Sequence, residues 1–154
     1  MMSVEEKIKE MGLQLPEATA PLGAYRPVVI SGNHAYTSGH GPLSPDGSFV
    51  KGRMGDDVDA DQGYAAAKYA GLAMLSSLKK ELGSLDRIKR VVKVLGMVSS
   101  TPEFTAQPAV INGCSELFRD LFGEEVGVGA RSAVGVASLP AGWVVEIEGI
   151  FEIE

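Results

Sequence analysis

Cysteine, histidine and long apolar runs are scarce in this sequence, and each scarcity argues against a class of protein. The chain has one cysteine and two histidines. Cys114 alone cannot form an internal disulfide, which fits a protein of the reducing cytoplasm. No stretch of about 18 apolar residues is present, so we expect no membrane-spanning helix. The N-terminus, MMSVEEKIKEMGLQL, lacks the apolar centre of a secretory signal peptide.

Basic residues are also few, with 14 lysines and arginines against 20 acidic residues and a net charge of −6. A nucleic-acid-binding protein usually gathers lysine and arginine on one face. The only local concentration is Arg87, Lys89, Arg90 and Lys93, whose spacing is typical of the solvent side of a strand. RNA or DNA is therefore disfavoured as the main partner. A Gly-rich phosphate loop and a Cys/His cluster with metal-ligand spacing are both missing.

The remaining composition is that of an ordinary globular protein, with 154 residues of which 45% are hydrophobic. This length suits one core, and no repeat or linker divides the chain, which predicts a single domain over residues 1–154. Residues 3–12 predict a short helix, because Ser3 can cap its start and Gly12 can end it. Residues 1–15 would then form an N-terminal helical extension.

Hydrophobic periodicity predicts two long helices and five strands. Gly32-Asn33 tolerates positive φ, which favours a β-hairpin at that point. The predicted elements are strands 27–31 and 34–38, helix 59–82, strand 87–100 (apolar enough to be covered on both faces), helix 107–122, and strands 131–139 and 143–154 joined by a turn at 140–142. The order β-β-α-β-α-β-β predicts an α/β (α+β) fold, with two helices on one face of a mixed sheet. Other copies of the chain could cover the open face, which favours a homo-oligomer.

Arg131 is the most distinctive candidate for a functional residue. It opens a strand after a Gly-rich loop, and residues 132–138 carry no charge. An arginine in a buried strand needs a partner, because an unpaired buried charge costs several kcal/mol. The guanidinium offers a planar fork of donors that fits a carboxylate in two parallel bonds. The partner could be a protein carboxylate, a helix C-terminus or the carboxylate of a ligand, and the residues alone favour neither a structural nor a ligand-binding role.

Glu146 and His40 are further candidates. Glu146 lies on the last strand, on the face opposite that of Val145 and Ile147. If residues 140–142 join the last two strands as a hairpin, about 17 Å separates Arg131 from Glu146 in one chain, so they would share a site only across a subunit boundary. His40 lies where a strand runs into a glycine loop, in which backbone groups can approach a ligand. Cys114 sits among apolar residues and is interpreted as a small core residue.

Several segments together resemble the RidA/YjgF family. The resemblance covers about residues 18–152, and its C-terminal part, an arginine followed by Leu-Pro and Glu-Ile-Glu, is fairly specific. The residues that carry it are Gly23-Ala24-Tyr25, Tyr36-Thr37-Ser38-Gly39, Asn112, Gly129-Ala130-Arg131-Ser132-Ala133-Val134, Leu139-Pro140 and Val145-Glu146-Ile147-Glu148. The resemblance implies a chorismate-mutase-like fold and a trimer with clefts between subunits. The first 15 residues resemble an extension found in a longer, divergent branch.

The resemblance also implies an activity, the hydrolysis of reactive enamines and imines to 2-keto acids and ammonia without a metal or cofactor. Arg131 would bind the substrate carboxylate, and Glu146 would position or activate the attacking water. Further substrate contacts would come from Tyr25, Gly39, Ala133, Asn112 and His40. The sequence departs from the family where Ala133 replaces a frequent cysteine and His40 replaces an amide side chain. The main alternative is a non-catalytic trimer that binds a small carboxylate, and a ribonuclease fits the acidic balance less well.

Overall fold

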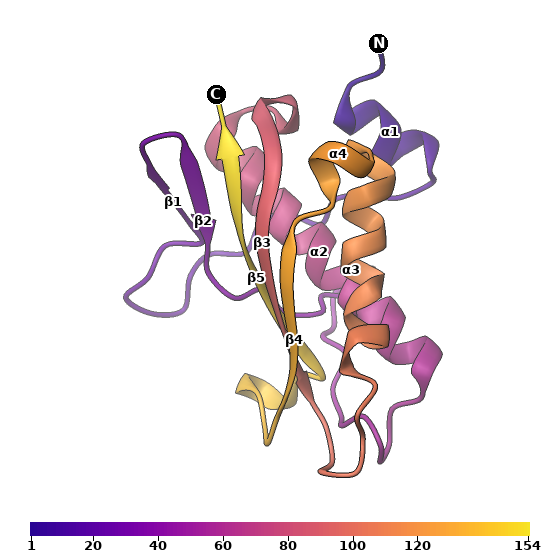
Figure 1. Ribbon diagram of the computed structural model, residues 1–154. Coiled ribbons are helices and arrows are strands. Elements are labelled where there is room, and N and C mark those ends of the chain that lie inside the picture. The colour runs from indigo at the N-terminus through magenta and orange to yellow at the C-terminus, as the bar shows by residue number, and fades with distance from the viewer.

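The computed structural model describes residues 1–154, which form one five-stranded sheet in the order β1-β2-β5-β3-β4 with two long helices packed against it (Figure 1). The α+β fold class predicted from the sequence is confirmed. The elements are α1 (Val4–Glu10), β1 (Val28–Ser31), β2 (His34–Thr37), α2 (Ala60–Leu82), β3 (Ile88–Ser99), α3 (Gln107–Phe122), α4 (Glu124–Gly127), β4 (Ala130–Val136) and β5 (Val145–Ile153), with 3-10 turns at Leu85–Arg87 and Pro140–Gly142. None of the helices is long and apolar enough to span a bilayer.

Local signals explain where the helices begin and end. The carboxylate of Asp59 caps α2 by accepting a hydrogen bond from the backbone N–H of Gln62. The side chain of Gln62 accepts in turn from the backbone N–H of Asp59, and the two bonds form a capping box. Gly83, at φ 84°, ends the helix in a conformation that other residues rarely adopt. Pro108 lies in the first turn of α3, where its missing N–H costs nothing. The segment after α3, predicted as a loop, contains the single turn of α4.

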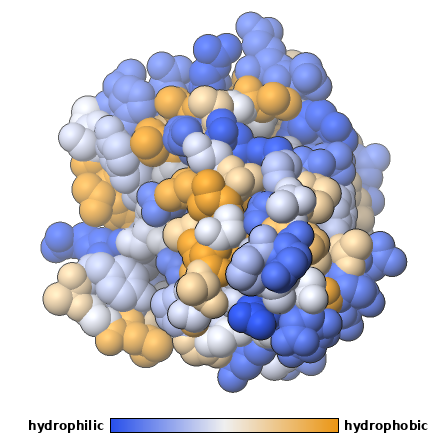
Figure 2. Space-filling model, turned by 60° about the horizontal axis from the view of Figure 1, so that its bottom comes forward, coloured by the Kyte–Doolittle hydropathy of each residue, from blue (hydrophilic) through white to orange (hydrophobic).

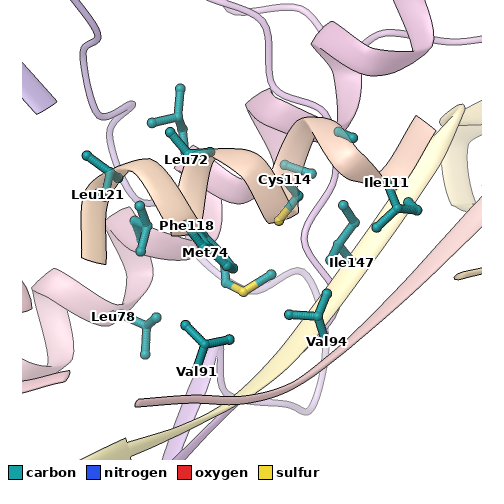
Figure 3. Close-up of a cluster of buried hydrophobic side chains, with 14 of the residues drawn as sticks. Leu72, Met74, Leu78, Val91, Val94, Ile111, Cys114, Phe118, Leu121 and Ile147 are labelled. Atoms are coloured by element: carbon teal, nitrogen blue, oxygen red, sulfur yellow. The ribbon is translucent and has the colours of Figure 1, made fainter. Parts of the chain in front are cut away.

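The core lies between the sheet and the pair α2 and α3 (Figure 3). Phe118 of α3 contacts Phe151 of β5 edge to face, with ring centroids 5.9 Å apart. The two helices approach closely at Gly113, where a Cβ would collide with the backbone of Tyr64. The sulfur of Cys114 points into the same cluster in Figure 3, and this thiol is fully buried. Residues with helical spacing in the sequence therefore form the core-facing side of both helices.

The strand pairing differs from the predicted hairpin. Strand β3 lies between β4 and β5, pairing parallel with β4 and antiparallel with β5, so β4 and β5 do not touch as neighbours. The hairpin pairing on which the 17 Å separation depended is therefore absent, whereas residues 140–142 do form the predicted turn between the two strands. Because α3 carries the chain back from the end of β3 to the start of β4, the two strands must run in the same direction. The turn at 140–142 instead carries the chain from β4 past the end of β3 to the start of β5.

The second face of the sheet is not covered by any helix of the chain (Figure 1). The registers align Val29, Tyr36, Ile150 and Lys93 in one row across this face, and Val134, Met97 and Glu146 in another. Along β5, buried residues alternate strictly with half-buried ones, as the sequence predicted. The central strand β3 is thus buried on its helix side and half-exposed on the other, not covered on both faces within one chain.

Candidate functional site

Arg131 stands at the start of β4, and its guanidinium reaches across to α3. Its Nη1 donates to Oδ1 of Asn112 at 2.8 Å and to Oγ of Ser115 at 3.1 Å. These two partners lie three residues apart and therefore on the same side of the helix. None of the ion pairs in the chain includes Arg131. The arginine is exposed in the single chain, which corrects the expectation of a buried position, and the rest of its donor fork has no protein acceptor.

A cavity of about 280 Å³ surrounds this arginine and is walled mainly by α3 and by residues 127–130. Ala133 lies two residues further along β4, on the same side of the strand, and packs against the core opposite Gly96. Cys114 lies beneath the arginine, where burial raises the pKa of its thiol to about 12 despite the nearby positive charge. Cys114 is thus a protonated core residue, as expected, and it is no nucleophile.

Gly39 and Glu146 meet at the other edge of β5. Hydrogen bonds between the backbones of His40 and Ile147, of 2.8 and 3.0 Å, fix the loop after β2 against β5. Gly39 therefore lies directly against the neighbouring side chain of Glu146, and a Cβ at residue 39 would collide with its carboxylate. A side chain at residue 39 would push the carboxylate of Glu146 aside, because the backbone of the loop and the acid share the same space. The backbone of this loop and the carboxylate can both contact one small ligand.

The carboxylate of Glu146 is half-buried, and its pKa is raised, first by burial and second by the negative charge of Glu148. Glu148 lies two residues along the same strand, so both side chains are on the uncovered face of the sheet. A raised pKa makes the ionised form a stronger base than an ordinary glutamate. Glu146 therefore has the chemistry expected of a group that takes a proton from water.

His40 is held inside the chain by both ring nitrogens. Its Nδ1 lies 2.7 Å from the carbonyl oxygen of Ser38, and its Nε2 lies 2.8 Å from Oγ of Ser77 on α2. A carbonyl oxygen only accepts, so Nδ1 carries the proton and Nε2 accepts from the serine hydroxyl. Burial lowers the pKa of His40, and the hydrogen bond to Ser38 offsets part of that effect. His40 is thus neutral and anchors the loop that carries Gly39.

Tyr25, Gly39 and His40, all predicted to contact substrate, line one cavity of about 660 Å³. Tyr25 contributes its ring from the segment that leads into β1, and the side chain is half-exposed. Figure 2, which brings the bottom of the molecule forward, shows apolar residues exposed among hydrophilic ones. The predicted site residues on this side of the molecule therefore form one cluster with Glu146, through the contact of Gly39 with its carboxylate.

Arg131 and Glu146 do not meet within one chain. Arg131 is level with Val94 of β3, whereas Glu146 is level with Met97 on the other side of that strand. Three residues along the strand and two strand spacings place their Cα atoms about 14 Å apart. Their side chains also lie on opposite faces of the sheet, since Arg131 contacts α3 and Glu146 is on the uncovered face. One chain thus presents two separate halves of the predicted site.

Comparison with known proteins identifies the family. Residues 5–142 match the family described as "YjgF/chorismate mutase-like, putative endoribonuclease". The chain belongs to this family. The protein TCP17 of Trypanosoma cruzi is 42% identical over 97% of this chain and 94% of its own length. The crystal structure of the Agrobacterium tumefaciens protein Atu1372, of unknown function, is 42% identical with a TM-score of 0.90, covering 99% of this chain and 94% of that one.

Two other members of the YjgF family have informative names. The crystal structure of RidA from an Antarctic Psychrobacter species is 30% identical with a TM-score of 0.61, covering 89% of this chain and 94% of that one. Escherichia coli TdcF, whose crystal structure contains bound serine, is 25% identical with a TM-score of 0.58, covering 90% of this chain and 94% of that one. The RidA/YjgF resemblance found from the sequence motifs is thereby confirmed.

Two residues of the candidate site were missed by sequence reasoning. Ser115 shares Nη1 of Arg131 with Asn112, and its position three residues after Asn112 was a usable signal. Ser77 hydrogen-bonds to Nε2 of His40 through its hydroxyl, and it lies within the apolar run of α2. A serine at a core-facing helix position needs a hydrogen-bond partner, but the sequence does not say which residue supplies it.

Proposed function

We propose that this protein hydrolyses reactive 2-imino and enamine acids to 2-keto acids and ammonia. The observation that carries this proposal is the state of Arg131. Its guanidinium is anchored by Asn112 and Ser115, has no carboxylate partner in the chain and borders a cavity of about 280 Å³. An oriented, unpaired guanidinium fork suits the carboxylate of a small acid. The relationship to RidA, and the serine bound to TdcF, support a ligand of this class.

The active form in this proposal is a homo-oligomer, a trimer as in the resemblance, with each site between two subunits. The two halves of the site lie on opposite faces of one sheet, so a second copy is needed to bring them together. The uncovered face also exposes large apolar side chains, among them Val29, Tyr36 and Val134 with exposed fractions of 47%, 43% and 42%. Exposed apolar side chains on a sheet face that no helix covers are typical of protein interfaces.

In the proposed reaction the substrate carboxylate binds Arg131 of one subunit, and the imine carbon lies beside Glu146 of the other. Water adds to the imine carbon while one of its protons passes to the carboxylate of Glu146. The imine nitrogen, protonated before the attack, is now the amino group of the carbinolamine and takes the proton back from Glu146. The C–N bond then breaks, ammonia leaves, and the hydroxyl proton passes to solvent, which gives the 2-keto acid. Neutral His40 keeps the loop of Gly39 in place against Glu146 during these steps. No cofactor enters this balance.

The direct test is to generate 2-iminopropanoate or 2-iminobutanoate with an amino-acid oxidase and to measure keto acid release. We expect the protein to accelerate release over buffer and Glu146→Gln to lower kcat by about 100-fold, the usual contribution of a general base. Size-exclusion chromatography with light scattering would show the trimer in the same preparation. Absence of acceleration by a folded trimer would refute the deaminase proposal.

A second candidate is a non-catalytic trimer that binds small carboxylates. It is favoured by the fact that the Arg131 cluster is complete without Glu146. The two candidates differ in the role of the acid. A Glu146→Ala variant that binds 2-oxobutanoate normally, in a protein without measurable turnover, would support the binding role. A variant that binds normally but has lost most of the wild-type turnover would support the enzyme.

A further inference from the structure

The larger cavity of the chain adjoins the proposed site and is mainly apolar. Its volume is about 660 Å³, against about 280 Å³ for the cavity at Arg131. Its walls are the segment before β1, the loop after β2, and the stacked rings of Phe49 and Trp143, whose centroids are 5.0 Å apart. Ala73 of α2 lines it as well. A cavity of this size matches pockets that hold ligands much larger than a three-carbon acid.

The cavity begins at the backbone that contacts the proposed base. Gly39 lines the cavity, and it also lies directly against the carboxylate of Glu146. Glu146 is on the uncovered face and the cavity extends toward Ala73 of α2, so a substrate whose imine carbon is next to Glu146 would pass its side chain into the cavity around the sheet edge at Gly39. Its carboxylate would point away from the cavity, toward Arg131 of the partner subunit, because no arginine lines this space.

The interior of this cavity has no charged group that could bind a polar side chain of a substrate. Both ring nitrogens of His40 are already engaged by Ser38 and Ser77, so the imidazole presents only its ring to the cavity. Glu17 and Lys51, the charged lining residues, are exposed. The surface available to a substrate side chain is thus formed by aromatic rings and small apolar groups, which favour apolar side chains by removing them from water.

We propose that the preferred substrates are 2-imino acids with a bulky apolar side chain, branched aliphatic or aromatic, and that this side chain occupies the 660 Å³ cavity. This inference rests on the proposed function, because it takes the hydrolysis of 2-imino acids as the reaction. Ala73 is the specificity-determining residue, because a larger side chain at this half-buried position fills the cavity from α2.

The experiment compares imines that an amino-acid oxidase produces from alanine and from leucine. We expect kcat/KM to be at least about tenfold higher for the leucine-derived imine, since each buried methylene contributes a several-fold preference. Ala73→Leu should lower the ratio of the two kcat/KM values by about tenfold. Ala109→Leu, the same change at an exposed position of α3 that lines neither cavity, is the control and should leave the ratio unchanged.

A binding measurement separates this inference from the proposed function. Calorimetric titration of the wild-type protein should show tighter binding of 4-methyl-2-oxopentanoate than of pyruvate, by about tenfold, whether or not turnover occurs. Tighter binding of 4-methyl-2-oxopentanoate than of pyruvate, without any catalysis, would support the side-chain pocket and refute the deaminase proposal. Catalysis with equal kcat/KM values and equal affinities would support the deaminase and overturn the side-chain pocket. The binding result needs no variant, so it stands even if Ala73→Leu does not fold.

Discussion

Replacement of Arg131 tests the carboxylate anchor most directly. A bidentate pair consists of two charge-assisted hydrogen bonds, each contributing about 1.5–3 kcal/mol. Arg131→Ala should therefore weaken binding of a 2-keto acid by about 3–6 kcal/mol, a loss of at least two orders of magnitude in Kd. Arg131→Lys keeps the charge but not the planar fork, and should lose about half of this free energy. Calorimetric titration with 4-methyl-2-oxopentanoate measures both losses.

The free energy of unfolding should respond differently to the same change. Arg131 is exposed and makes two hydrogen bonds but no ion pair within the chain, so Arg131→Ala should destabilise the subunit by about 1 kcal/mol or less. Arg53→Ala is the matched control, because this exposed arginine is paired with Asp56 at 3.9 Å and lines neither cavity. Affinity within threefold of wild type in Arg131→Ala, or a loss of several kcal/mol in urea unfolding, would refute a role in ligand binding.

Three other substitutions test neighbouring parts of the argument. Gly39→Ala should lower kcat by about tenfold or more with a smaller effect on keto acid affinity, because its Cβ displaces the carboxylate of Glu146, and an unchanged kcat would contradict this geometry. The pKa of Glu146 is raised above 4.5, and its carboxylate acts as a base only when ionised, so kcat/KM should fall as the pH drops through that raised pKa. Glu148→Gln removes the neighbouring negative charge, which should lower the pKa of Glu146 and shift the acid limb of the pH–rate profile to lower pH. An acid limb that does not move would exclude an effect of Glu148 on Glu146. Gly113→Ala should destabilise the protein by about 1–3 kcal/mol in urea unfolding, because its Cβ meets the backbone of α2, while Gly23→Ala, with only ordinary contacts, should cost far less.

Local patterns in the sequence were enough to predict the elements and their inward faces. The apolar spacing of residues 60–82 and the strict alternation of residues 145–153 each match the buried sides that the structure shows. These predictions succeed because side-chain direction repeats with the local backbone period, 3.6 residues in a helix and two in a strand. The family motifs likewise identified Arg131 and Glu146 as candidates without any knowledge of their distance.

Only the tertiary structure decided which residues meet. Strand pairing joins segments that are distant in sequence, and no local pattern indicated that β3 would lie between β4 and β5. That insertion changed the relation of Arg131 to Glu146 from one strand spacing to two, with their side chains on opposite faces. Packing also placed Ser77 beside His40 and Gly39 beside Glu146. The sequence by itself determined which chemical groups are available, and the sheet order determined that one chain holds them as two separate halves.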